Sequence, residues 1–328
     1  MAPGSDGRPD WQPVAPLENL RRRARLLQRI RAFFAERGVM EVETPALSRA
    51  AITDPHLQSF AARYSGPGHA AGLPLYLHTS PEFPMKRLLA AGAGPIYQLC
   101  KVFRQGEAGR RHNPEFTLLE WYRPGYDHHA LMDEVEALAA SVLGLAERAE
   151  RISYREAFRR YLNIDPLESP LDALRAAARD HGIRGFDAEE QRDLWLDLLL
   201  SHCIEPELGR EGLCFLYDYP ASQAALARLN PEDPRLAERF ELYYRGVELA
   251  NGFHELADAG EQRRRFETER TARRKQGLEQ VPLDEYLLAA LEQLPDCSGV
   301  ALGIDRLVML ALGADSLDEV MAFTIDNC

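Results

Sequence analysis

Two strand-like segments on either side of a charged loop constrain the fold of this 328-residue chain more than any other feature. Ile96 to Phe103 and Phe116 to Tyr122 are rich in apolar and aromatic residues, and the loop Gly106 to Arg111 between them is polar and basic. This succession predicts an antiparallel pair of strands. A second hairpin-like segment, Phe240 to Phe253, turns at Arg245-Gly246. The chain therefore contains antiparallel β-structure.

Long helical segments separate these strands. Leu17 to Arg37 has the apolar spacing of an amphipathic helix, and Gly260 to Gly277 is a strongly charged helix. Together they predict an α+β fold, an antiparallel sheet flanked by helices. We expect residues 1–16 to be a disordered lead-in, rich in Pro and Gly, and residues 17–328 to form one domain. The helix-dominated stretch at about 153–208 is expected to be an insertion on this domain.

Composition limits the possible environments and partners. The net charge of −12 weighs against broad, non-specific nucleic-acid binding, which needs many Lys and Arg contacts to phosphates, whereas carboxylates in a cleft attract cationic ligands. The five cysteines show no paired spacing, which argues against a disulfide framework and against a zinc site. No apolar run is long enough to span a bilayer, and a signal-peptide pattern is missing. A cytoplasmic location is expected.

The segment from Phe103 to Tyr122 carries the first group of candidate site residues. Arg104 has the planar fork of donors that grips phosphate, and His112 and Phe116 lie where they can bracket a flat base. Glu120 alternates with apolar neighbours on a strand that also carries Tyr122, so both side chains can point into one cleft. The alternative for this segment is a solvated hairpin with a surface ion pair.

Further candidates lie nearer the C-terminus. Glu241 and Glu248 flank a turn and offer the oxygen ligands that divalent metals prefer, and Asn251 and Glu255 follow in reach of a ligand. The alternative is an edge hairpin whose glutamates face water. Arg306 begins a helix, where a cation opposes the helix dipole, so a compensating negative group is expected nearby.

Two other groups have adequate structural explanations. Ser80 and Glu82 have the composition of a helix start. Six histidines without ligand spacing are interpreted as surface or core residues: His56, His69, His128, His129, His181 and His202.

Taken in order, three of these segments resemble the signature motifs of class II aminoacyl-tRNA synthetases, most closely the catalytic domain of lysyl-tRNA synthetases. Gly38 to Pro45 resembles motif 1, Phe103 to Glu120 motif 2 and Gly299 to Arg306 motif 3. The likeness extends from about Leu17 onward. Two further segments, Arg111 to Pro124 and Gly246 to Leu256, resemble the elongation factor P lysine ligases, bacterial paralogues that attach (R)-β-lysine to a lysine side chain of that factor.

This resemblance implies an ATP-dependent enzyme that uses Mg²⁺ and forms a homodimer through motif 1. Arg104 and Arg306 would be catalytic, and Glu241 and Glu248 would bind magnesium. The implied ATP-binding residues are Arg104, Gln105, Gly106, His112, Asn113, Phe116, Glu248, Leu249, Gly303 and Arg306. The implied substrate-binding residues are Ser80, Glu82, Glu120, Tyr122, Asn251 and Glu255.

Two departures from the lysyl-tRNA synthetase pattern bear on specificity. The usual glutamate two residues after Arg104 is Gly106, followed by Glu107. Ala301 stands where those synthetases have glycine and the ligases usually have alanine, and its methyl group is worth about 1–3 kcal/mol of discrimination between α- and β-lysine.

The acceptor is the last expectation. The chain begins at the catalytic domain, without the anticodon-reading domain of lysyl-tRNA synthetases, so elongation factor P is the expected acceptor and tRNA is not. Three alternatives remain open: a minimal lysyl-tRNA synthetase charging tRNA, a stand-alone amide-forming synthetase, and a non-catalytic paralogue that binds amino acid or nucleotide.

Overall fold

The computed structural model describes residues 11–186 and 190–328. The predicted disorder of residues 1–10 therefore lies outside the described residues. The remainder of the expected lead-in contacts the body of the protein: Val14 N donates to Ala322 O at 2.9 Å, and Ala15 is buried.

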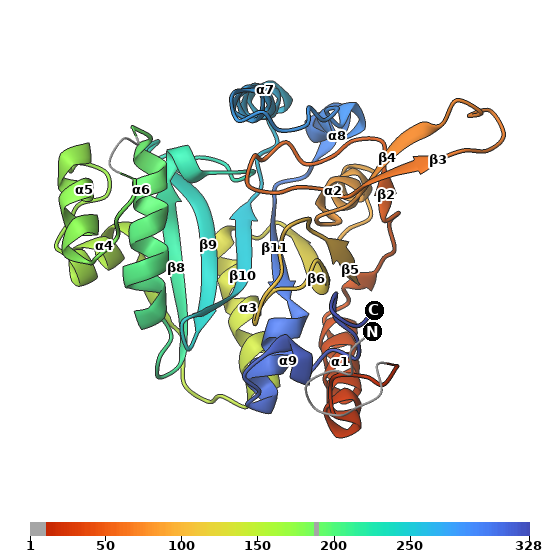
Figure 1. Ribbon diagram of the computed structural model, residues 1–328, viewed down its shortest axis with the longest axis horizontal. Coiled ribbons are helices and arrows are strands. Elements are labelled where there is room, and N and C mark those ends of the chain that lie inside the picture. The colour runs from red at the N-terminus through yellow and green to blue at the C-terminus, as the bar shows by residue number, and fades with distance from the viewer. Residues whose placement is uncertain (1–10, 187–189) are drawn as a thin grey trace.

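An eight-stranded sheet is the centre of the molecule (Figure 1), with the strand order β1-β5-β6-β11-β10-β9-β8-β7. The pairings between β5 and β8 across the middle of the sheet are antiparallel, as the sequence predicts. The two outer pairings, β1 with β5 and β7 with β8, are parallel. The strands are β1 Met40–Glu41, β5 Ile96–Phe103, β6 Glu115–Pro124, β7 Glu150–Ser153, β8 Leu213–Pro220, β9 Leu236–Tyr244, β10 Val247–His254 and β11 Cys297–Gly303.

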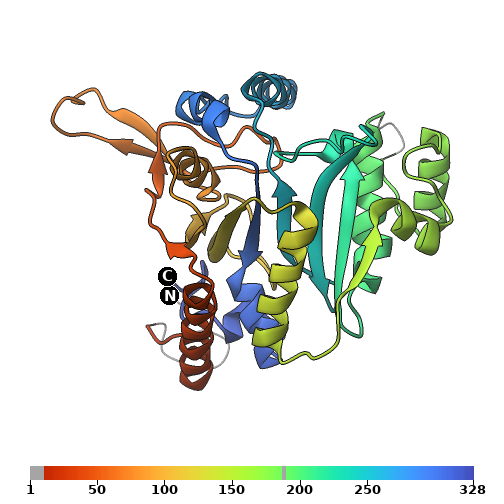
Figure 2. The same ribbon diagram turned by 180° about the vertical axis from the view of Figure 1, so that it is seen from behind.

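Helices cover one face of this sheet (Figure 2): α1 Leu17–Glu36, α3 His128–Leu143 and α9 Ile304–Leu312. Asp127 caps α3 by accepting from Ala130 N at 2.7 Å, and Gly144 ends it in the left-handed conformation. Alternate residues of each strand face these helices, so Leu119 and Trp121 of β6 pack into the same core as α3. The other alternate set faces away from α3.

In the described residues of the predicted insertion the α-helices are α4 Tyr154–Leu162, α5 Leu171–Asp180 and α6 Arg192–Leu199. They form a second hydrophobic core with β8 at the outer side of the sheet. A capping box at Ser153 and Glu156 starts α4. The insertion is therefore stabilised by its own hydrophobic core, which includes residues of β8.

The end of the sheet at the top of Figure 1 is covered by α2 Glu82–Ala90, α7 Ala259–Lys275 and α8 Glu285–Ala290. A three-stranded sheet lies beside them, formed by β2 Leu47–Ser48, β3 Ala61–Tyr64 and β4 Leu73–Leu77. Within the two described ranges, no helix is both long and apolar enough to cross a membrane.

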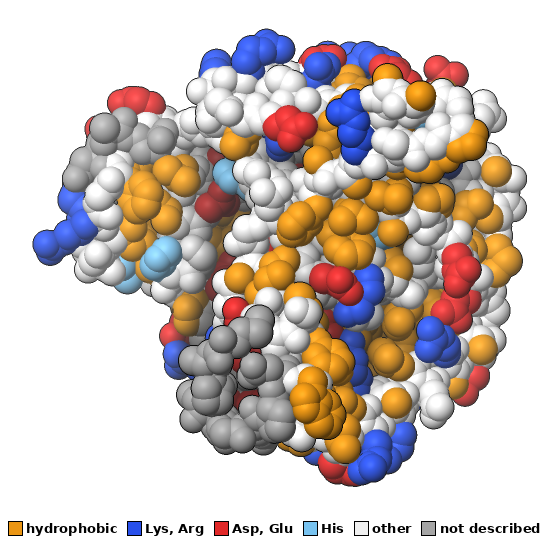
Figure 3. All heavy atoms as spheres, turned by 45° about the vertical axis from the view of Figure 1, so that its right-hand side comes forward, with side chains coloured by type: hydrophobic (Ala, Val, Ile, Leu, Met, Phe, Trp, Pro, Cys, Tyr) orange, Lys and Arg blue, Asp and Glu red, His pale blue; other side chains and the backbone are white. Residues whose placement is uncertain are grey.

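Figure 3 turns the side that carries α1, β1 and the small sheet toward the reader and shows hydrophobic side chains gathered in several patches. The exposed large hydrophobic residues of the N-terminal part, β1, β2 and the C-terminal segment are Trp11, Leu17, Met40, Leu47, Phe323 and Ile325.

Candidate active site

A cavity of about 560 Å³ lies against the sheet face that points away from α3. Its floor is formed by the alternate residues that α3 does not contact, such as Glu120 and Tyr122 of β6 and Arg239 and Glu241 of β9. Thr79 and the first turn of α2 close one side. The alternation of each strand therefore separates the cavity from the core.

Nearly all of the predicted site residues line this one cavity. Gln105 and Gly106 do not, although their neighbours Arg104 and Glu107 line it; Gln105 N donates to Gln58 O at 2.8 Å. The predicted residues that line the cavity are Ser80, Glu82, Arg104, His112, Asn113, Phe116, Glu120, Tyr122, Glu241, Glu248, Leu249, Asn251, Glu255, Gly303 and Arg306. Segments far apart in the sequence thus meet at one site.

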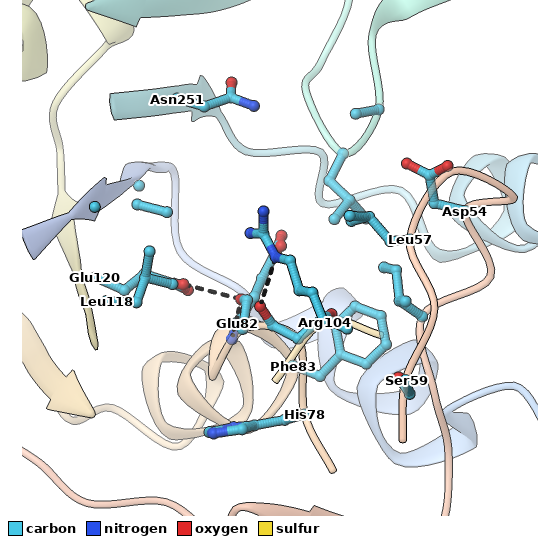
Figure 4. A pocket seen from close by; sticks show the side chains of 18 of the residues that line it. Asp54, Leu57, Ser59, His78, Glu82, Phe83, Arg104, Leu118, Glu120 and Asn251 are labelled. Carbon is cyan, nitrogen blue, oxygen red and sulfur yellow. Dashed lines mark hydrogen bonds between the residues drawn. The ribbon is translucent and has the colours of Figure 1, made fainter. Parts of the chain in front are cut away.

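Glu120 is a deeply buried carboxylate in one end of the cavity, with 2% of its surface exposed. Ser80 Oγ donates to its Oε2 at 2.9 Å, and Tyr122 OH donates to its Oε1 at 2.7 Å. Figure 4 shows Glu120, Glu82 and Arg104 pointing toward the middle of the cavity. Because both donors fix the orientation of Glu120, its carboxylate is held ready for a cation.

A buried lysine joins two more carboxylates at this end. Lys86 Nζ of α2 lies 2.6 Å from Glu82 Oε1 and 2.6 Å from Glu255 Oε2. Burial alone would lower the pKa of Lys86, but the charges of Glu255 and Glu82 raise it above its ordinary value. Lys86 is therefore a permanent cation between Glu82 and Glu255. Sequence reasoning missed it because lysine on a helix ordinarily faces water.

The carboxylates of this end are under electrostatic strain. Burial, and then the charge of Glu82, raises the pKa of Glu120 to about 8. Burial also raises the pKa of Glu255, against the opposing effect of Lys86. Glu82 and Glu255 contact the ammonium group of Lys86, and Glu120 lies near these two carboxylates without a cation of its own. One cation therefore does not neutralise the cluster, and a cationic ligand would relieve the strain.

Gly299 of β11 makes room for this cluster. A Cβ atom there would lie 2.2 Å from Tyr122 Cε1 and 2.5 Å from Glu255 Oε1. The neighbouring Ala301 pairs with Glu120 on one side and Asn251 on the other, and it also lines the cavity. Glycine at 299 is therefore required by close approach, whereas the methyl group of Ala301 occupies part of the cavity floor.

The other end of the cavity is rich in arginine. The Arg104 guanidinium lies 5.0 Å from the ring centre of Phe116, and its Nη1 lies 3.7 Å from Glu107 Oε1. Gly106 has a φ of 88°, a conformation that disfavours a glutamate there. Glu107, the next residue, is the carboxylate of this loop that lines the cavity.

Arg306 is held by two other segments of the chain. Its Nη1 donates to Glu248 O at 3.1 Å and lies 3.3 Å from Glu248 Oε2, and its Nη2 lies 2.6 Å from His112 Nε2. Burial and the charge of Arg306 lower the pKa of His112, so the ring is neutral and accepts from Arg306 at neutral pH. Glu248 is the compensating negative group that the sequence predicts beside this helix N-terminus.

Glu241 is engaged by the chain itself. Tyr219 OH and Tyr243 OH donate to its Oε2 at 2.6 and 2.5 Å, and Arg239 Nη2 lies 2.5 Å from its Oε1. Sequence reasoning missed these three partners, which lie on neighbouring positions of β8 and β9.

Glu205, which sequence reasoning also missed, adds a carboxylate beside Glu241 and Glu248. Burial and the charges of Glu241 and Glu248 raise the pKa of Glu205 to about 7, and burial and Glu241 raise that of Glu248. Arg239 pairs with Glu241 and Arg306 with Glu248, so this set keeps one uncompensated negative charge when all three carboxylates ionise. These oxygen donors fit a hard divalent cation, and Glu248 is the most available ligand because Glu241 already accepts three hydrogen bonds.

The two predicted asparagines differ in availability. Asn113 Nδ2 donates to Glu115 O at 2.7 Å, and its Oδ1 accepts from Ile325 N at 2.9 Å. Its amide therefore ties the C-terminal segment to the cavity wall. Asn251 Oδ1 accepts from Arg239 Nε at 3.2 Å, which leaves the amide nitrogen of Asn251 for a ligand.

Comparisons with known proteins identify a matching family and similar proteins. The family model of class II tRNA synthetases (D, K and N) matches residues 14–327. Proteins named elongation factor P–(R)-β-lysine ligase are similar over nearly the whole chain. Those of Klebsiella pneumoniae (strain 342) and Salmonella dublin are each 57% identical over 319 residues, which is 97% of this chain and 98% of the relative.

Proposed function

The chain belongs to the class II tRNA synthetase family of the D, K and N type, and from this premise we propose that it is an ATP-dependent ligase. It activates (R)-β-lysine or lysine as an adenylate and transfers it to a lysine side chain of elongation factor P. The names of the relatives support this activity. The observation that carries the proposal is the excess negative charge at the Glu120 end of the cavity.

The charge of this cluster matches a diamino acid. Lys86 pairs with Glu82 and Glu255, and Glu120 lies near these carboxylates, so two unit negative charges are uncompensated when all three carboxylates ionise. Lysine and β-lysine each carry two ammonium groups. Both also have one carboxylate, which in this cavity would point toward Arg104. A monoamine would leave one buried charge unpaired, a costly arrangement.

In the activation step, an oxygen of the substrate carboxylate attacks the α-phosphorus of ATP, and the bond to the β-phosphate oxygen breaks to release pyrophosphate. The carboxylate is already ionised, so the step needs no general base. Arg104 and Arg306 position the triphosphate and neutralise charge that develops on it. Phe116 would stack on adenine on the side where it contacts the Arg104 guanidinium.

Magnesium fits the carboxylates at the insertion side of the cavity. Glu248 and Glu241 would hold it, with Glu205 beside them. When bound, the ion supplies charge neutralisation for the phosphates. The chain's own part is to orient these carboxylates through Tyr219 and Tyr243.

In the transfer step, the neutral ε-amine of the acceptor lysine attacks the carbonyl carbon of the adenylate. An amide bond forms, and AMP leaves with the electron pair of the broken anhydride bond. A free lysine amine has a pKa of about 10.4, so it must lose its proton before or during the attack.

Two further properties complete the proposal. The enzyme forms a homodimer through the side with exposed Met40, Leu47, Phe323 and Ile325, since patches of this kind mark protein interfaces. It works in the cytoplasm, in keeping with its five free cysteines.

The decisive experiment follows labelled substrate to its acceptor. The protein is incubated with ATP and labelled (R)-β-lysine or lysine, together with elongation factor P or tRNA. Label on elongation factor P supports the proposal, and label on tRNA supports the minimal synthetase. Label in a small-molecule amide would refute the proposal in favour of the stand-alone amide-forming synthetase. Bound lysine without consumption of ATP would refute it in favour of the non-catalytic paralogue.

The site assignment has its own test. Arg104→Ala and Glu248→Ala are each expected to reduce ATP–pyrophosphate exchange by about 100-fold or more. Arg110→Ala is the matched control for Arg104, because Arg110 lies in the same loop but pairs with Asp315 at the surface. Exchange near the wild-type rate in either site variant contradicts the assignment.

A further inference from the structure

We propose that this chain binds one zinc ion outside the cavity, on the helical face of the sheet, through His128, Glu238 and His254. One donor atom from each of these three buried residues lies within 4.8 Å of the others. The site uses two imidazoles and a carboxylate, so the cysteine spacing, which speaks only to thiolate sites, has no bearing on it.

The three residues come from adjoining elements beneath the cavity floor. His128 is the first residue of α3, Glu238 lies on β9 and His254 ends β10. Figure 2 shows α3 lying across this face of the sheet. On β9, Arg239 points into the cavity, so Glu238, its neighbour, points to the opposite side. The zinc site and the cavity thus share a sheet but occupy opposite faces.

His128 provides an observation that points to a ligand. It is 4% exposed, and among the described residues neither of its ring nitrogens has a hydrogen-bond partner. A buried polar group without a partner is costly, and native proteins rarely tolerate one without a reason. A metal ion bound to one of these nitrogens would supply the missing interaction.

His254 is already held in the orientation of a metal ligand. Its Nε2 lies 3.0 Å from Asp296 Oδ1, and its Nδ1 lies 2.6 Å from Glu238 Oε2. A carboxylate that accepts the distal N–H is the usual second partner of a metal-bound histidine, and it fixes the tautomer. Asp296 performs this function for Nε2. Zinc would replace the proton between Nδ1 and Glu238, so binding releases that proton.

Asp218 of β8 lies near His128 but beyond hydrogen-bond distance. Its Oδ1 lies 3.7 Å from His128 Nε2 and is buried without a hydrogen-bond partner in the described part of the chain. Its backbone has a φ of 58°, and the ladder shifts register between Tyr217 and Tyr219. A bulge re-aims a side chain in this way, and such strained positions cluster at functional sites.

The donor set favours zinc over harder cations. Two histidines and one glutamate form a known zinc combination, with bonds of about 2.0–2.2 Å, whereas Mg²⁺ and Ca²⁺ prefer oxygen ligands alone. Tetrahedral zinc places its ligands about 3.4 Å apart, by the same bond lengths, so the three side chains need only small rotations from the 4.8 Å limit. Glu238 and Asp218 balance the charge of the ion, because Asp296 already pairs with Arg228.

The test titrates Zn²⁺ into chelator-stripped full-length protein without ATP and counts bound metal. We expect one zinc per chain that is lost in His128→Leu, and a rise in melting temperature on zinc addition that the variant does not show. His128 has no hydrogen bonds to lose, so this variant should fold, and circular dichroism of the stripped protein checks that it does. His202→Gln, which removes an exposed histidine, should bind zinc as the wild type does.

Three further measurements sharpen the result. Asp296→Asn should weaken zinc binding by about 10- to 100-fold, and Co²⁺ in the site should show the visible bands of tetrahedral coordination. Wild-type protein that binds no zinc, or His128→Leu that binds it unchanged, overturns the proposal. So does zinc binding that is lost in Glu248→Gln but kept in His128→Leu, because the ion would then lie in the cavity. None of these outcomes depends on the proposed ligase activity.

Discussion

Replacing Glu120 by glutamine should stabilise the empty protein at neutral pH while weakening its hold on lysine. Glu120 is 2% exposed, and its pKa is raised from 4.5 to about 8. Between these two values the folded state binds a proton that the unfolded state has lost, so the free energy of unfolding falls as pH rises through this window. Glutamine has no such proton and removes this pH dependence.

The size of this stabilisation follows from how far the pH lies above the ordinary pKa of Glu120, up to its raised pKa in the folded state. Each pKa unit corresponds to about 1.4 kcal/mol, so at pH 7 the ionisable Glu120 costs about 3 kcal/mol relative to an uncharged group. Glutamine keeps the local hydrogen bonds, because Tyr122 OH still donates to the amide oxygen and Ser80 Oγ accepts from the amide nitrogen. The difference in unfolding free energy between Glu120→Gln and wild type should therefore be small at pH 5 and grow toward pH 8.

Urea unfolding of both proteins at pH 5, 6, 7 and 8 without ligand measures this difference. Glu211→Gln, which changes an exposed glutamate, is the control and should track the wild type at every pH. The same Glu120→Gln variant should bind lysine about 10- to 150-fold more weakly, from the loss of a hydrogen bond to a charged group worth about 1.5–3 kcal/mol. Parallel pH profiles for Glu120→Gln and wild type, or a variant less stable at pH 8, would refute the reasoning.

Three more substitutions test the same end of the cavity. Lys86→Met leaves Glu82 and Glu255 without their buried cation and should lower the free energy of unfolding by about 3–5 kcal/mol in urea; an unchanged value contradicts the ion pairs. Gly299→Ala should cost about 1–3 kcal/mol through collision with Tyr122, measured by thermal unfolding. Its control Gly303→Ala, where a Cβ meets nothing closer than 3.9 Å, should unfold like the wild type. Ala301→Gly should raise the use of α-lysine relative to β-lysine about 10- to 200-fold in pyrophosphate exchange, and an unchanged ratio removes Ala301 from specificity.

The sequence predicts the parts of the fold whose signals are local. Ile96–Phe103 has the predicted bounds of β5, and the helix predicted from Leu17 ends one residue early, at Glu36. Strand β8, Leu213–Pro220, was not predicted. Its first five residues, Leu213 to Tyr217, are all apolar or aromatic, and such a run lacks the alternation that identifies a half-buried strand. The parallel edge pairings likewise depend on contacts between distant segments, which no local pattern encodes.

The site shows the same division between local and distant signals. Glu120 and Tyr122 were predictable because alternation on one strand places both side chains on one face. Lys86 was not, because its burial depends on Glu255, which lies far along the chain. Asn113 was predicted to lie near a nucleotide, and it does line the cavity, yet its amide is bound to Glu115 and Ile325, a use that only the position of the C-terminal segment reveals.

The register of β9 links the cavity to the helical face of the sheet. Glu238 and Arg239 are consecutive, and a shift of one residue would exchange the faces on which they lie. Irregularities in both neighbouring ladders, between Glu248 and Ala250 and between Tyr217 and Tyr219, fix this register. A zinc ion bound by His128, Glu238 and His254 would connect α3 to β9 and β10 on the helical face of the sheet. The same two strands carry Arg239 and Asn251, which line the cavity on the opposite face. Zinc bound on the helical face would stiffen the strands of the cavity floor from the opposite side of the sheet.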